Sequence, residues 1–259
     1  MQSNKVLDAL IGLSVGDALG VPVEFKAREI LKSNPVVGMI GYGAHNQPPG
    51  TWSDDSSLAF CLADSLCKGY DLNDIARSFV RWYQEGYWTP HGKVFDIGIA
   101  TSRALHRVAT GVSPFTSGGV GEENNGNGSL MRILPIVFYL RDQPIRERFR
   151  IVSEVSAVTH GHVRSIFACL LYCEYALQLL KGAEKFGAFQ GMQDIVNAFI
   201  KEYPVIDEVE WKRFHRLLEN PVGAYEILPL YQYYEAEIAS SGYVIHTLEA
   251  SLWCLLNTN

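Results

Sequence analysis

Cysteine, basic charge and long apolar runs are all scarce in this sequence of 259 residues. Its five cysteines are an odd number and lack the paired spacing of zinc-finger ligands, which excludes a finger-type domain. Cys169 and Cys173 stand one helical turn apart within an apolar run. We therefore expect them to be reduced residues of the core.

The N-terminal segment, Met1 to Lys5, lacks the basic stretch and apolar run of a signal peptide. No uninterrupted apolar run is long enough for a membrane span, so the sequence predicts no membrane association. Together with the cysteine usage, these absences favour a cytoplasmic protein. The formal net charge of −6 provides no general attraction for nucleic acid, so nucleic acid is not an expected partner. A phosphate-bearing ligand would need local amides, arginines or metal ions.

Hydrophobic residues make up 47% and charged residues 19%, as in ordinary globular proteins. Apolar residues recur at helical spacing through most of the chain, whereas strand candidates are few and short. The sequence therefore predicts an all-α fold, a compact multi-helix domain spanning residues 1–259. Helical patterns cover 6–19, 57–66, 72–83, 97–108, 130–140, 151–160, 165–180, 192–203, 211–218 and 244–256.

Four polar clusters interrupt these patterns. The first runs from Gly16 to Glu24 and places Asp17 in an apolar, glycine-spaced helix. A carboxylate is costly there unless it is hydrogen-bonded, so Asp17 is expected to be a structural acceptor. Glu24 follows the helix on a loop, where catalytic groups often lie, although a solvated loop carboxylate would have the same pattern.

The second cluster, Ser53-Asp54-Asp55-Ser56, stands at the start of a predicted helix. Adjacent carboxylates and hydroxyls are the hard oxygen ligands that Mg²⁺ and Mn²⁺ prefer, and the helix dipole favours their ionised form. The alternative is that Ser53 only caps the helix and the aspartates occupy its first turn.

The third cluster, residues 125–129, joins two asparagines and two glycines to Ser129 before a predicted helix start. Inward-turned amides and a helix N-terminus could bind a diphosphate, although the glycine spacing is neither that of a Walker loop nor that of a dinucleotide fingerprint. The alternative is an ordinary loop between two helices.

The fourth cluster is Thr159-His160-Gly161-His162. No cysteine or acid lies nearby at ligand spacing, so a zinc site is disfavoured and a ligand-binding histidine is preferred. The remaining histidines are interpreted as surface or packing residues: His45, His91, His106, His215 and His246.

In chain order the clusters read G-D-A-L-G-x-x-x-E, S-D-D-S, G-N-G-S-x-M-R and T-H. This succession resembles the ADP-ribosylglycohydrolase family, which includes dinitrogenase reductase-activating glycohydrolases and the ADP-ribosylarginine and ADP-ribosylserine hydrolases. The likeness extends over nearly the whole chain, through a late helix from Gly242 to Trp253. It implies an all-α hydrolase that cleaves the ADP-ribose C1″ bond of modified protein side chains or small ADP-ribose adducts.

The resemblance also implies residue roles around a binuclear Mg²⁺ or Mn²⁺ site. Ser53, Asp54 and Asp55 would be metal ligands, with Ser53 standing where many members have threonine. Glu24, with the two aspartates, would take part in catalysis. Three residues of the glycine-asparagine loop, together with His160, would contact ADP-ribose: Asn127, Gly128 and Ser129. Asp17 would support the site without touching substrate.

One departure from the family pattern is a missing motif. Family members carry a second metal motif, Asp-x-Asp-Thr, beyond the late helix, and no Asp-x-Asp occurs in this sequence. The domain is therefore expected to be incomplete at its C-terminus, and to hold one weakly bound ion or none. Truncation, loss of activity and completion by another chain stay open. The alternative function is a catalytically inactive ADP-ribose or nucleotide-binding protein of the same fold. The sequence leaves the leaving group, the choice of metal and the oligomeric state undecided.

Overall fold

The computed structural model describes residues 4–218 and 228–258, which form helices joined by turns and loops. Residues 1–3 of the N-terminal segment and Asn259 lie outside this description. The elements, in chain order, are α1 (Lys5–Gly20), η1 (Val21–Val23), α2 (Arg28–Ser33), α3 (Asp54–Leu66), α4 (Leu72–Glu85), α5 (Ile99–Ala109), η2 (Glu122–Asn124), α6 (Pro135–Leu140), α7 (Ile145–Ala157), α8 (Val163–Leu180), α9 (Lys185–Glu202), α10 (Glu208–Lys212), α11 (His215–Leu218), η3 (Leu230–Gln232), η4 (Glu235–Glu237) and α12 (Val244–Asn257).

Within the described residues the only β-type pairings are two isolated bridges, Gly119 with His160 and Gly126 with Tyr243. The all-α prediction is therefore confirmed. Both bridges tie loops that surround the candidate site.

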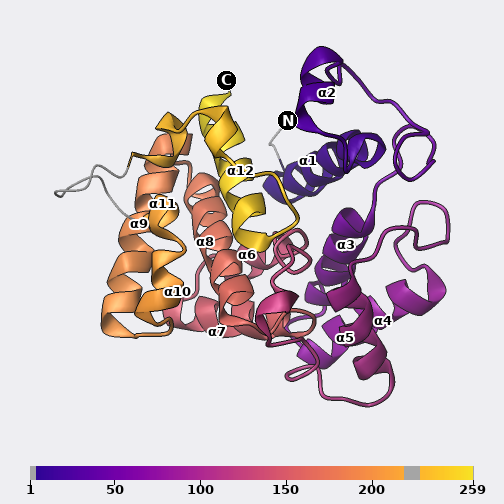
Figure 1. Ribbon diagram of the computed structural model, residues 1–259. Coiled ribbons are helices and arrows are strands. Elements are labelled where there is room, and N and C mark those ends of the chain that lie inside the picture. The colour runs from indigo at the N-terminus through magenta and orange to yellow at the C-terminus, as the bar shows by residue number, and fades with distance from the viewer. Residues whose placement is uncertain (1–3, 219–227, 259) are drawn as a thin grey trace.

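The helices form two groups joined by α6 and α7 (Figure 1). On one side α3 packs against α1, α4 and α6; on the other α8 packs against α7, α9 and α12. Helix α8 lies at the centre of the second group, with Phe167, Leu170 and Leu171 fully buried. The two predicted core cysteines, Cys169 and Cys173, are buried on the same helix and free.

Helix α4 shows how the sequence specifies these elements. The Asp71 side chain accepts a hydrogen bond from a first-turn amide and so caps the helix. Ile75, Phe79 and Trp82 recur on one face, and all three are buried against the core. Gly86, with φ of 71°, ends the helix in the left-handed conformation that glycine adopts without strain.

The structure differs from the predicted helices most clearly at three places. The helix predicted over 130–140 begins only at Pro135, which has no amide proton to donate and therefore favours the first turn of a helix. Residues 130–134 form turns instead. The range 211–218 is divided between α10 and α11, and the short helix α2 has no counterpart among the predictions.

Helix α1 is apolar on all sides but exposed, and only Ala18 is buried within it. Residues 5–23 reach a mean hydropathy of 1.6 with 17% buried, and α8 reaches 1.3 with 61% buried. Both segments have the length and composition of a membrane span, so the expectation that no segment would do so is wrong. The extensive burial of α8 is that of a core helix.

Candidate active site

The start of α3 is fixed by a carboxylate from α1. Asp17 accepts hydrogen bonds from the Ser53 backbone amide at 2.9 and 3.1 Å. It also accepts from the amide and the hydroxyl of Ser56, at 3.1 and 2.5 Å. Asp17 is thus the structural acceptor that its sequence context predicts, and it orients the first turn of α3.

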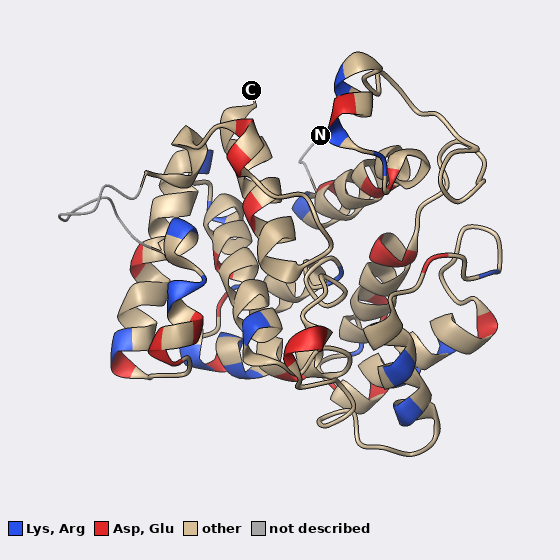
Figure 2. Ribbon diagram, viewed as in Figure 1, with Lys and Arg blue, Asp and Glu red and all other residues tan. Residues whose placement is uncertain are grey.

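Ser53 caps α3 and also contacts Asp55, the second residue of the helix. Its hydroxyl lies 3.3 Å from the Asp55 amide and donates to the Asp55 carboxylate at 3.1 Å. The capping interpretation of Ser53 is therefore correct as local structure, and it places the Ser53 oxygen beside the carboxylate. Figure 2 shows acidic residues at this end of α3, where it faces the middle of the molecule.

The two aspartates lie close to other acids, and this raises their pKa values. Asp54 is only 7% exposed, and burial raises its pKa well above the usual range, with neighbouring Asp55, Asp96 and Asp17 adding to the shift. Burial, followed by repulsion from Asp17, raises the pKa of Asp55 to about 7. Buried acids with raised pKa values are typical of functional sites.

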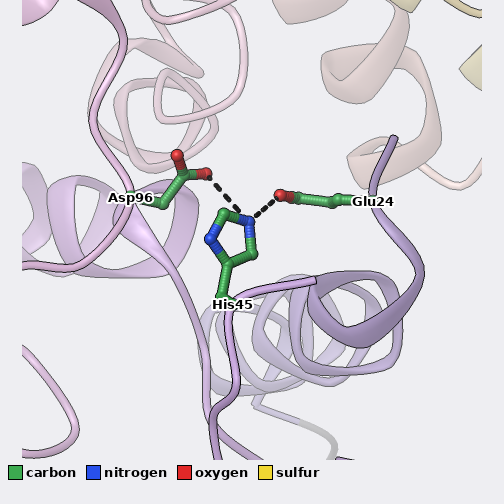
Figure 3. Close-up of side chains that lie close together, drawn as sticks. All are labelled: Glu24, His45 and Asp96. Atoms are coloured by element: carbon green, nitrogen blue, oxygen red, sulfur yellow. Dashed lines mark hydrogen bonds and ion pairs between the residues drawn. The ribbon is translucent and has the colours of Figure 1, made fainter. Parts of the chain in front are cut away.

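Glu24 lies beside this cluster and is linked to two residues from other loops (Figure 3). The Nε2 atom of His45 is 2.5 Å from a Glu24 oxygen and 3.9 Å from an Asp96 oxygen. Burial raises the pKa of Glu24, which the His45 hydrogen bond partly offsets. The expectation that His45 would be a simple surface or packing residue therefore misses a direct link between two acids.

The glycine-asparagine loop is held against the last helix. The Asn127 amide donates to the Gly242 carbonyl at 3.0 Å, and the Val244 amide donates to the Asn125 carbonyl at 2.9 Å. Because α6 begins only at Pro135, the helix that follows this loop in sequence does not start directly after it, and the loop contacts the first residue of α12 instead. The prediction that a helix starts directly after the loop is therefore wrong.

Gly128 lies where only glycine fits. A Cβ atom at this position would stand 2.7 Å from the Cε1 atom of His160 and 2.9 Å from the Thr101 hydroxyl. The absence of a side chain lets the loop approach the histidine ring closely.

His160 is buried and its protonation follows from its partners. Arg132 donates to the Thr159 hydroxyl at 2.8 Å, which leaves that hydroxyl to donate to Nδ1 of His160 at 2.8 Å. The remaining ring proton then lies on Nε2, which faces the loop at Gly126 and Gly128. Burial and the Arg132 charge lower the pKa of His160 to about 3, so the ring is a neutral donor.

These elements enclose one cavity of about 400 Å³. Its lining unites six of the residues predicted from sequence: Glu24, Asp54, Asp55, Asn127, Gly128 and His160. Ser53 and Ser129 are not part of the lining. Ser129 is fully buried behind the loop, where its hydroxyl lies 2.9 Å from the Ser156 hydroxyl. His162 caps α8 by accepting from the Arg164 amide, so the two histidines do not form a ligand pair.

Sequence reasoning missed Asp96, His45 and Phe25. Asp96 and Phe25 line the cavity, and His45 contacts both acids beside it. The only local signal for Asp96 is its position just before a helix, and His45 lies in a turn-rich segment without any ligand spacing.

The donor set fits a divalent cation. Oxygen atoms of Ser53, Asp54 and Asp55 gather at one helix start, and no lysine or arginine lines the cavity to balance the two carboxylates. Mg²⁺ and Mn²⁺ prefer such ligands. Glu24, His45 and Asp96 form a second possible group, with one donor atom from each residue within 4.8 Å of the others. Each group also contains an internal hydrogen bond, from Ser53 to Asp55 in the first and between His45 and Glu24 in the second.

The all-α fold with this acid-lined cavity matches a known class. The family model for ADP-ribosylglycohydrolase matches residues 1–259, and the chain belongs to the ADP-ribosylglycohydrolase family. It is 32% identical over 264 residues to ADP-ribosylarginine hydrolase Tri1 of Pseudomonas putida, covering 99% of this chain and 62% of the relative. It is 30% identical over 186 residues to the ADP-ribosyl-dinitrogen reductase glycohydrolase of Rhodospirillum rubrum, covering 69% and 59%.

A solved structure of an ADP-ribosylglycohydrolase-related protein complex has the same fold. It aligns with a TM-score of 0.73 at 29% identity and covers 99% of this chain and 76% of that one. The chain thus spans less than two thirds of the curated relatives that it matches, 62% of the Pseudomonas putida protein.

Proposed function

We propose that this protein hydrolyses the bond between the C1″ carbon of ADP-ribose and an arginine side chain of a modified protein. The observation that carries the proposal is the single cavity that brings Glu24 and the Asp54-Asp55 pair together with Asn127, Gly128 and His160. Two relatives that align with 99% of this chain bear the name ADP-ribosylarginine hydrolase, which supports arginine as the leaving group.

The loop side of the cavity would hold the nucleotide. The Asn127 backbone amide is already bonded to Gly242, so its side-chain amide is the group proposed to bind ADP-ribose. The open backbone at Gly128 lets a ligand approach closely, and the Nε2 proton of His160 can be donated to a phosphate or ribose oxygen. His160 provides this donor without carrying a charge.

Ser53, Asp54 and Asp55 would hold Mg²⁺ or Mn²⁺. A bound divalent ion supplies positive charge beside the buried acids and lowers the pKa of a bound water. The family resemblance implies two ions, and these three residues would be ligands of one of them.

Hydrolysis breaks the bond from C1″ to the arginine nitrogen, adds the hydroxyl of water to C1″ and delivers a proton to the departing nitrogen. Glu24 is placed to handle that proton because its pKa is raised and His45 is hydrogen-bonded to it. Asp96, 3.9 Å from the same His45 nitrogen, adds negative charge that favours an oxocarbenium-like transition state.

The test is incubation with Mg²⁺ and three substrates: ADP-ribosylated arginine, ADP-ribosylated serine and O-acetyl-ADP-ribose. We expect release of ADP-ribose from arginine, and we expect Glu24→Gln to lower kcat by about 100-fold or more. Glu29→Gln, an exposed carboxylate on α2, is the matched control and should leave kcat unchanged. Inactivity of the wild-type protein on all three substrates would refute the proposal.

The second candidate is a catalytically inactive protein of the same fold, in which the cavity would bind ADP-ribose without hydrolysing it. Calorimetry with ADP-ribose separates the two functions. Binding that is independent of Mg²⁺, without turnover of any substrate, would favour the binding protein over the hydrolase.

A further inference from the structure

Phe25 has a positive φ angle, a backbone conformation that phenylalanine rarely adopts. Residues 23–26 form a turn closed by a hydrogen bond from the Lys26 amide to the Val23 carbonyl. Glu24 has φ of −50° and ψ of 147°, and Phe25 has φ of 61°, the angles of a type II turn. The third position of such a turn favours glycine or asparagine, so an aromatic residue there is strained.

Burial of the Phe25 side chain does not offset this backbone strain. It is 89% exposed, the second most exposed of the large hydrophobic residues described. Neither local backbone preference nor core packing therefore explains an aromatic residue at this position. Its place on the cavity lining, directly after Glu24, offers a functional reason.

The ring stands on the acidic side of the cavity. Its centroid lies 5.8 Å from that of the His45 ring, which bonds Glu24 and lies near Asp96. Phe95 also contacts His45, at 5.5 Å between ring centroids. An exposed aromatic ring thus lies beside the histidine that links two carboxylates.

The cavity as a whole has the charge of a cation-binding site. Its described lining contains five carboxylates and neither lysine nor arginine; the acids are Glu24, Asp54, Asp55, Asp96 and Glu123. A guanidinium group is a planar cation that stacks on aromatic rings and donates two parallel hydrogen bonds to a carboxylate. Phe25 and its neighbouring acids offer both contacts, whereas a neutral leaving group would use neither.

We propose that Phe25 determines leaving-group specificity by stacking on the guanidinium of ADP-ribosylated arginine, with Glu24 beside it. This inference rests on the proposed function and specifies how the same cavity selects its substrate. Phe25 contacts the leaving group and takes no part in proton transfer.

The experiment compares Phe25→Leu, which keeps an apolar side chain without a ring, with Phe25→Trp, which keeps an aromatic face. We expect Phe25→Leu to raise KM for ADP-ribosylated arginine by about 5- to 20-fold, the range of a cation–π contact, with little change in kcat. KM for ADP-ribosylated serine and the affinity for free ADP-ribose should stay within about 2-fold, since neither carries a cation at this position. Phe25→Trp should restore the arginine KM.

The control is Val120→Ala, which removes another exposed apolar side chain outside the lining and should change no parameter. An equal change on both substrates, or no change with Phe25→Leu, overturns the Phe25 proposal while the hydrolase function stands. If the wild-type protein turns over neither substrate, the proposed function fails. Calorimetry then tests the role of Phe25 independently of turnover. Equal affinity of wild type and Phe25→Leu for ADP-ribosylated arginine would overturn the inference.

Discussion

Both carboxylate oxygens of Asp17 accept the backbone amide of Ser53, at 3.1 and 2.9 Å, and so fix the helix start that carries the candidate metal ligands. Replacing Asp17 with asparagine exchanges one acceptor oxygen for a donor facing these amides. We expect the affinity for Mn²⁺ to fall by about 10- to 100-fold, as when other supports of metal ligands are removed. Calorimetric titration with Mn²⁺ measures this change.

The control for Asp17 is Asp142→Asn, which neutralises a side chain that is 84% exposed and should leave Mn²⁺ affinity unaltered. Unchanged Mn²⁺ binding by the Asp17 variant would show that the first turn of α3 is held by other contacts.

Gly128 and Gly126 form a matched pair for testing the close approach of the loop to His160. A Cβ at Gly128 would clash with His160 and Thr101, whereas a Cβ at Gly126 would meet its nearest atom at 3.7 Å. We expect Gly128→Ala to weaken ADP-ribose binding by at least 10-fold and to destabilise the fold by about 1–3 kcal/mol, the usual effect of overpacking. Gly126→Ala should be within about 0.5 kcal/mol of wild type. Calorimetry and thermal unfolding provide the comparison, and equal behaviour of the two variants would contradict it.

The neutral state of His160 predicts acid sensitivity. Its folded-state pKa of about 3 lies below the ordinary value of 6.5, so the unfolded chain binds the extra proton in this window. Stability is fully present above the unfolded pKa and is lost as pH falls towards 3, by up to about 1.4 kcal/mol per pH unit. Urea unfolding at several pH values gives the free energy of unfolding as a function of pH. This free energy should fall less steeply with decreasing pH for His160→Gln than for wild type. His106→Asn, at an exposed position, should keep the wild-type slope.

Arg148 and Glu174 form a buried ion pair between α7 and α8, with two hydrogen bonds of 2.6 Å. Because Glu174 is fully buried, Glu174→Gln leaves an arginine charge without its partner. We expect a loss of about 3–5 kcal/mol in unfolding free energy. The exposed pair Arg81 and Glu85 is the comparison, and Glu85→Gln should cost less than about 1 kcal/mol. Similar losses of unfolding free energy in both variants would contradict the expectation that the buried ion pair is more costly to break than the exposed one.

Much of the fold and part of the site could be predicted because their signals are local. The spacing of apolar side chains predicts α3, α4 and α8, and the Asp54-Asp55 pair can be recognised from its position at a helix start. The start of α6 could not be placed from apolar spacing alone, because Pro135 overrides that pattern.

The site residues that the sequence did not predict, Asp96 and His45, have no local sequence pattern that indicates a site. Asp96 and His45 become functional candidates only through the packing that brings their loops to Glu24, and their separation along the chain carries no spacing rule. Ser129 shows the converse case. It shares the loop of Asn127 and Gly128, but its side chain points into the core, where it lies 3.4 Å from the Cys169 sulfur.

The bridge between Gly126 and Tyr243 joins the loop of the cavity to the beginning of the final helix, while Asp17 and Glu24 come from the first elements of the chain. Pairings across so long a stretch of chain close late, since loop-closure entropy opposes them until most of the molecule is ordered. During synthesis, the nascent polypeptide would therefore lack a working pocket until Tyr243 has left the ribosome.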